Sequence, residues 1–200
     1  MGRPRTFDET TVLDAAAGEF RVHGFADTST ERLCEAAGVR RSSLYNAFTS
    51  KDELFVRALE RYVEVTGEKQ AAVLTDETMN GAERLRGLLD LIIAEECEAA
   101  EHGHAAGCMA VNTRMNPDLG ERDPRVKALL DRALDRQISL LEQAIHVGRL
   151  DGGLKAGIPV REAALSVVTL VSGLRVLAQA GSPPVELRRV ADLTLGALIA

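Results

Sequence analysis

The segment GVRRSSLYNAFTSKDELF, Gly38–Phe55, decides the expected fold class and the kind of partner. One short predicted helix at about residues 41–47 gathers cationic and hydrogen-bonding side chains: Arg40, Arg41, Ser42, Ser43, Tyr45 and Asn46. Leu44, Ala47 and Phe48 give this helix an apolar side for packing. Such a helix fits the major groove of DNA, where arginine suits guanine, asparagine suits adenine and hydroxyl groups suit phosphate. An ordinary solvated helix face is the alternative, and the concentration of donors in one segment disfavours it.

Capping residues and glycines mark helix boundaries on both sides of this segment. A Ser or Thr followed three residues later by Glu predicts a helix start in three places: Thr6 with Glu9, Thr28 with Glu31, and Ser50 with Glu53. Gly24 is expected to end the first helix in a left-handed conformation. Gly38 joins predicted helices at 28–36 and 41–47, which together form a helix, a tight turn and a second helix.

The rest of the chain also has helical periodicity. A helix begins at Lys51, the pattern weakens at 67–81, and further helices are predicted around 85–92 and 126–145. Pro159 opens a helix that reaches Ala180, and Pro183-Pro184 opens another that reaches Leu198. No segment alternates apolar and polar residues long enough for a sheet, so the fold class is all-α.

Charge limits the kind of DNA binding that is possible. The formal net charge is −6, and an acidic chain is no general coater of DNA. The placement of charge is more informative, because Val39–Lys51 holds three basic residues and no acidic one, and Arg3 and Arg5 add a basic N-terminus. Thr28, Thr30 and Lys51 fall at predicted helix N-termini, which favour phosphate. This distribution favours site-selective binding.

Targeting and catalytic signals are weak. No apolar signal-type stretch follows the basic N-terminus, and the longest uncharged run in the most apolar region, Ala163–Leu174, falls short of the roughly 18 residues of a membrane span. We therefore expect a cytoplasmic protein with no membrane partner. The three cysteines, Cys34, Cys97 and Cys108, suggest reduced thiols. An enzyme on a helical scaffold is the alternative of another class, and no nucleotide-binding loop, H-E-x-x-H or G-x-S-x-G motif supports it.

The residues Gly24-Phe25, Thr28–Thr30 and Ala36–Phe55 resemble the N-terminal DNA-binding domain of the TetR family of bacterial transcriptional regulators. The resemblance implies a repressor without a cofactor, which reads a palindromic operator as a homodimer and is released by a small-molecule effector. It implies a DNA-binding domain at 1–50, a connecting helix at 51–66 and a ligand-binding and dimerisation domain at 67–200. By the family pattern the DNA contacts fall on Thr28, Thr30, Arg40, Arg41, Ser42, Ser43, Tyr45, Asn46 and Lys51, with Tyr45 and Lys51 on phosphates.

The chain departs from the family pattern at the start of the predicted recognition helix. Arg40 and Ser42 stand where a Ser and a Gly are frequent, and an arginine has no side-chain oxygen with which to cap a helix. Cys34 takes a place that is usually Ala, and we interpret it as a small core residue.

The segment Glu101–Pro117 contains the candidate sensing residues His104, Cys108, Met109, Asn112 and Met115. It resembles a variant in one TetR subgroup, some members of which sense electrophiles or oxidants through a cysteine here. Cys108 is therefore interpreted either as a reactive thiol or as buried packing, and the two methionines either as pocket lining or as core. A metal site made by Cys97, His102, His104 and Cys108 is a further alternative by ligand type alone.

The last two predicted helices are strongly apolar. Residues 159–180 are apolar almost all round, and 184–199 adds Val190, Leu193, Leu195, Leu198 and Ile199. A monomer of this size covers both helices poorly, so we expect them to pair with a second copy. Burial inside one monomer is the alternative.

Overall fold

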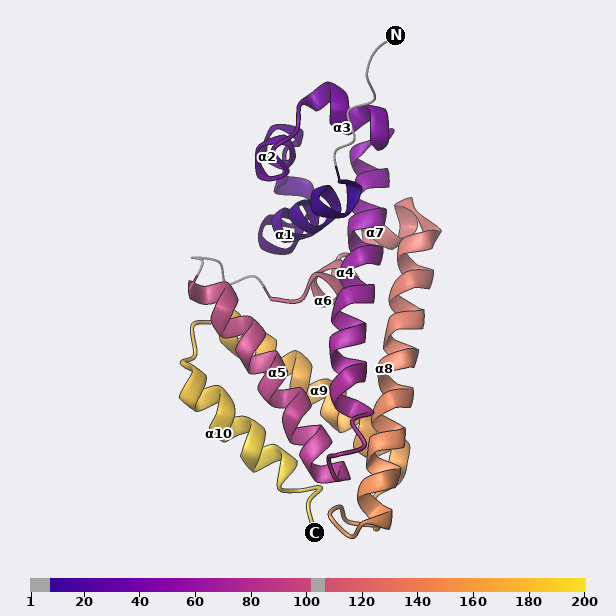
Figure 1. Ribbon diagram of the computed structural model, residues 1–200, viewed down its shortest axis with the longest axis vertical. Helices are drawn as coiled ribbons and strands as arrows, with labels where there is room; N and C mark the ends of the chain where they lie inside the picture. The colour runs from indigo at the N-terminus through magenta and orange to yellow at the C-terminus, as the bar shows by residue number, and fades with distance from the viewer. Residues whose placement is uncertain (1–7, 102–106) are drawn as a thin grey trace. The chain divides into compact units, whose positions relative to one another are not determined.

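A computed structural model of the protein describes residues 8–101 and 107–200, and helices dominate this part of the chain (Figure 1). They are α1 (Glu9–Asp27), α2 (Thr30–Ala36), α3 (Arg41–Ala47), α4 (Lys51–Leu74), α5 (Gly81–Glu101), α6 (Met109–Arg114), α7 (Pro117–Arg122), α8 (Pro124–Leu150), α9 (Val160–Gln179) and α10 (Pro184–Leu195). Over the described residues the extended structure is limited to one isolated bridge, between Leu154 and Ile199. The all-α prediction is confirmed.

The helices fall into two compact units. The described residues of Met1–Glu64 and Cys108–Leu129 form the first unit, and those of Val65–Gly107 and Leu130–Ala200 form the second. The predicted connecting helix 51–66 is longer than expected, because α4 continues to Leu74. The segment 108–129, expected in the ligand-binding body, packs in the first unit, where the Asn112 side-chain amide donates to the Arg21 carbonyl at 3.4 Å.

Three helix starts test the capping predictions. The backbone N–H of Glu53 donates to the Ser50 hydroxyl at 3.0 Å, so the cap before α4 is confirmed. Before α2 the prediction is wrong by one residue, because Ser29 is the cap and accepts from the Arg32 N–H at 3.1 Å. Asp8 caps α1 by accepting from the Thr10 N–H at 3.0 Å, and Thr6 lies outside the described residues.

Two glycines shape the first unit. Gly24 has φ 73° and interrupts α1, and Gly38 has φ 63° in the turn between α2 and α3. Both lie in the left-handed region that glycine reaches without steric cost. The sequence predicted this conformation for Gly24, and for Gly38 it predicted only the turn. They let the chain reverse around a core in which the Phe20 and Phe55 rings meet edge-on at 5.0 Å.

The second unit is built around α5, α8, α9 and α10. In Figure 1, α5, α9 and α10 lie side by side, and their contacts agree. Its core is aliphatic and fully buried at Leu85, Leu88, Ile92, Leu141, Ile145, Ala164, Val167 and Leu174. The last helix ends at Leu195 rather than Leu198, and residues 196–198 continue as a turn. Among the described helices, none is both long and apolar enough to cross a membrane.

Candidate nucleic-acid interface

Helix α3 begins without a side-chain cap. Arg40 is its N-cap residue and forms no side-chain cap hydrogen bond; its carbonyl accepts from the N–H groups of Ser43 and Leu44 at 2.9 and 3.0 Å. The prediction that Arg40 supplies no capping oxygen is confirmed. Its guanidinium is exposed instead, at the point where the chain enters α3.

The two sides of α3 differ in chemistry. Leu44 is buried, as is Phe48 at the end of the helix, and both join the core of the first unit. The opposite side is exposed and carries Arg41, Ser42, Tyr45 and Asn46, while Ser43 is half-buried. The structure therefore brings four of the predicted DNA-binding residues onto one accessible helix surface.

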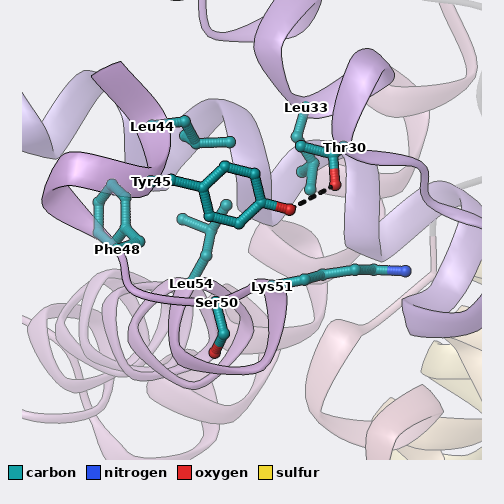
Figure 2. Close-up of a pocket in the computed structure, with 8 residues that line it drawn as sticks. All are labelled: Thr30, Leu33, Leu44, Tyr45, Phe48, Ser50, Lys51 and Leu54. Atoms are coloured by element: carbon teal, nitrogen blue, oxygen red, sulfur yellow. Dashed lines mark hydrogen bonds between the residues drawn. The ribbon is translucent and has the colours of Figure 1, made fainter. Parts of the chain in front are cut away.

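Side chains tie α2 to α3 across the turn. The Thr30 hydroxyl lies 3.1 Å from the Tyr45 hydroxyl, which Figure 2 shows as a dashed line. Arg41 Nη1 donates to Glu31 Oε1 at 2.8 Å, and the Arg41 guanidinium carbon lies 5.7 Å from the centre of the Tyr45 ring. These contacts hold the exposed side of α3 in a defined register with α2.

A small pocket lies beneath Tyr45 (Figure 2). It is lined by Thr30, Leu33, Leu44, Tyr45, Phe48, Ser50, Lys51 and Leu54, and it has no room for a ligand. Lys51 begins α4, and its ammonium lies 4.5 Å from the centre of the Phe25 ring. The pocket is therefore part of the packing that positions Tyr45 and Lys51 beside α2.

Thr28 is a correction to the predicted contact set. Its side chain is fully buried, and its hydroxyl donates to the Gly24 carbonyl at 2.6 Å, with the Glu19 carbonyl at 3.4 Å. The interruption of α1 at Gly24 leaves that carbonyl without a helical partner, and Thr28 supplies one. Its hydroxyl is thus not available to a phosphate. Arg3 and Arg5 lie outside the described residues.

Those of the predicted sensing residues that the structure describes do not line one cavity. Met109 is buried in the first unit, whereas Met115 is 79% exposed, so Met115 is not pocket lining. Asn112 is exposed and holds α6 to α1. Cys108 is the half-buried N-cap residue of α6 and makes no side-chain cap hydrogen bond. Both interpretations of its thiol stay hypotheses.

The remaining thiols and histidines give no metal centre in the described part of the chain. His102 and His104 lie outside that part, and within it no three His, Cys, Asp or Glu side chains gather. Cys34 is half-buried on α2, and burial raises the pKa of its thiol. A raised pKa disfavours the reactive thiolate, which agrees with a packing role for Cys34.

Sequence reasoning missed Glu31 and Arg122. In the sequence Glu31 stands only as the acidic end of a capping pattern, yet it is the ion-pair partner of Arg41. Arg122, at the end of α7, lies 5.5 Å from the centre of the Phe25 ring, the same ring that Lys51 contacts. No local pattern signals either contact, because residues distant in the chain meet only in the folded unit.

Comparison with known proteins agrees with this geometry. Residues 12–58 match the family model of the N-terminal domain described as "Bacterial regulatory proteins, tetR family". The regulator YezE of Bacillus subtilis is 30% identical over 151 residues, which cover 75% of this chain and 72% of YezE. The chain belongs to the TetR family.

Two further TetR-family relatives cover nearly the whole chain. The repressor ComR of Escherichia coli is 29% identical over 196 residues, 97% of this chain and 90% of ComR. A solved structure of the TetR-family regulator CifR, a triple cysteine mutant complexed with 26-bp operator DNA, is 31% identical with a TM-score of 0.81. It covers 98% of this chain and 100% of CifR. These relatives are transcriptional regulators by name.

Proposed function

We propose that this TetR-family protein is a transcriptional repressor that binds a palindromic operator as a homodimer and dissociates when a small molecule binds. The observation that carries the proposal is the exposed side of α3, which begins with two arginines and continues with Ser42, Tyr45 and Asn46. A recognition helix places its N-terminal residues against base edges in the major groove. CifR, similar over its whole length, is known in complex with operator DNA.

The proposed roles follow from the chemistry of each side chain. Arg40, Arg41 and Asn46 present the donors and acceptors that read base edges. Thr30, Ser42, Ser43, Tyr45 and Lys51 offer hydroxyl and ammonium groups to phosphates, which position a protein without specifying sequence. Arg3 and Arg5 are proposed as additional backbone or minor-groove contacts. A cytoplasmic location is part of this proposal, because a transcriptional repressor acts where its operator DNA is.

Selection from a random duplex library tests the proposal. The protein is incubated with the library at near-physiological salt, and bound duplexes are recovered, sequenced and footprinted. Enrichment of one palindromic duplex supports a site-selective regulator. Strongly salt-sensitive binding without any preferred sequence contradicts it, because phosphate contacts alone carry no sequence information.

Arg40→Ala and Lys51→Ala should weaken DNA binding in different ways. Loss of a base-reading arginine should lower affinity for the selected duplex by about 1–3 kcal/mol and relax preference at one position. Loss of a phosphate-contacting lysine should weaken selected and shuffled duplexes alike and reduce the salt slope by about 1. Titration at several salt concentrations measures both quantities. Lys155→Ala, in the second unit, serves as the control and should bind as the unaltered protein does.

The proposed homodimer interface is formed by α9 and α10. Leu165 and Val176 lie three turns apart on α9 and thus on one side of it, and both are exposed. On α10, Val185, Val190 and Leu193 are also exposed, and Leu193 has an exposed fraction of 82%. Apolar side chains concentrated on two adjacent helices are typical of an interaction surface.

Leu193→Asp combined with Val176→Asp should therefore produce monomers. Two charges buried in an apolar interface should raise the dimer dissociation constant by about 30-fold or more, the effect of losing one interface hot spot. Sedimentation equilibrium measures the change. Leu150→Asp alters a leucine that is 76% exposed on α8 and should leave the dimer intact. If that control dissociates the dimer and the α9–α10 variant does not, the interface is elsewhere.

The effector is proposed by class only, as a small molecule that binds preferentially to the form released from DNA. A ligand shifts such an equilibrium only by its differential affinity for the two states. A screen of small molecules for a raised melting temperature identifies candidates, and each is then tested for release of the selected duplex.

A further inference from the structure

We infer that Glu31 is a positioning residue that holds the Arg41 guanidinium in the orientation for reading bases, and so sets how strongly the protein prefers its operator over other DNA. The inference rests on the proposed function and deepens it, since it concerns the specificity of the same helix. Glu31 itself lies on α2, next to Thr30.

Three contacts link four side chains of α2 and α3. Arg41 Nη1 donates to Glu31 Oε1 at 2.8 Å, and the guanidinium lies against the Tyr45 ring, with its carbon 5.7 Å from the ring centre. Tyr45 is one helical turn after Arg41, and its hydroxyl lies 3.1 Å from that of Thr30, the neighbour of Glu31. Two residues of α2 thus hold two residues of α3.

These contacts restrict Arg41 while leaving it able to bind. The carboxylate accepts from one N–H group of the planar guanidinium, and the guanidinium lies over the Tyr45 ring. An arginine held this way loses less side-chain entropy on forming a bidentate contact, which favours the matching base. Arg40 provides the contrast, because within residues 8–101 and 107–200 no ion pair or ring contact restrains it.

The charge of Glu31 also favours the operator over other DNA. Its carboxylate offsets a positive charge at the start of α3 and so weakens the attraction of this helix to the phosphates of DNA of any sequence. Both side chains of the pair are largely exposed, 64% for Arg41 and 70% for Glu31, and exposed pairs contribute little to folding stability. The pair is therefore better explained by DNA selection than by stability.

The experiment compares two duplexes: one selected from a random library by the unaltered protein, and one of the same composition with shuffled sequence. Glu31→Gln removes the charge and loosens Arg41. We expect it to bind the shuffled duplex more tightly and the selected duplex no more tightly. The affinity ratio should fall by about five-fold, the lower end of what one bidentate contact contributes.

Glu35→Gln is the matched control. It removes one negative charge from the same short helix, at an exposed glutamate that forms no ion pair in the described part of the chain. It should change both affinities by the same factor and leave their ratio unchanged. In an Arg41→Lys background, Glu31→Gln should no longer lower the ratio, because the guanidinium it positions is gone. Circular dichroism verifies that each variant is folded.

Two results overturn the inference while leaving the proposed function intact. One is a ratio for Glu31→Gln equal to that of Glu35→Gln, which means that Glu31 acts only through net charge. The other is an equal fall in the Arg41→Lys background, which means that Glu31 acts without Arg41. If the unaltered protein enriches no duplex at all, the proposed function fails, and the inference with it.

Discussion

Arg175→Met is expected to destabilise the protein by about 3–5 kcal/mol, the cost of leaving a buried charge without its partner. Arg175 lies on α9, and its side chain is only 4% exposed. Nη1 donates to Glu96 Oε1 at 2.5 Å and Nη2 to Glu95 Oε2 at 2.9 Å, both on α5. Methionine fills a similar volume, so the loss reports on charge rather than on a cavity. Urea unfolding at a fixed protein concentration measures it.

A second variant separates the charge from the packing. In the double variant Arg175→Met with Glu96→Gln, a neutral amide replaces the more deeply buried carboxylate. Glu95 keeps a cationic neighbour, because Lys69 Nζ lies 3.8 Å from Glu95 Oε1. We expect this double variant to recover at least half of the stability that Arg175→Met loses, because replacing both partners of a buried pair costs far less than removing one. If Arg175→Met costs less than about 1 kcal/mol, the ion pair does not stabilise the α5–α9 contact as argued.

Gly81→Ala is expected to destabilise the second unit by about 3 kcal/mol or more, at the upper end of overpacking effects. Gly81 begins α5, and a Cβ atom there would lie 2.1 Å from the Gly148 Cα and 2.7 Å from the Ala144 carbonyl oxygen, both on α8. These are backbone atoms, which have no rotamer by which to avoid the new methyl group. The Gly81 N–H also donates to Asp151 Oδ2 at 2.8 Å, which helps to fix the close approach.

Gly18→Ala is the control for this prediction. Gly18 is exposed within α1, and a Cβ there would meet nothing within 4 Å. It should therefore stabilise its helix by up to about 1 kcal/mol, the difference in helix propensity. Thermal unfolding of the two variants side by side makes the comparison. A Gly81→Ala protein as stable as Gly18→Ala would mean that α5 and α8 separate without cost.

The sequence predicted the local features of the first unit well. The cap at Ser50, the left-handed Gly24, the turn at Gly38 and helix α3 at 41–47 all follow from interactions between residues a few positions apart. Such interactions depend little on the rest of the fold, so a local pattern suffices to predict them. The uncapped start of α3 at Arg40 follows in the same way, from the absence of a side-chain oxygen.

The errors arise where local patterns compete. Thr28 and Ser29 are both good caps, and the choice between them depends on which hydroxyl is buried. The open carbonyl of Gly24 takes the Thr28 hydroxyl, and Ser29 becomes the cap of α2. The same competition removes Thr28 from the proposed phosphate contacts.

By itself, the sequence determined the all-α class, the helix-turn-helix and the residue types on the exposed side of α3, because helical periodicity and capping are local properties. Only the tertiary structure decided that α6 packs with α1, through a hydrogen bond between residues 91 positions apart, and that Glu31 holds Arg41. It also decided that Met115 is exposed rather than pocket lining. Contacts between distant residues form only when the apolar faces of several helices pack together, and no short segment encodes that arrangement.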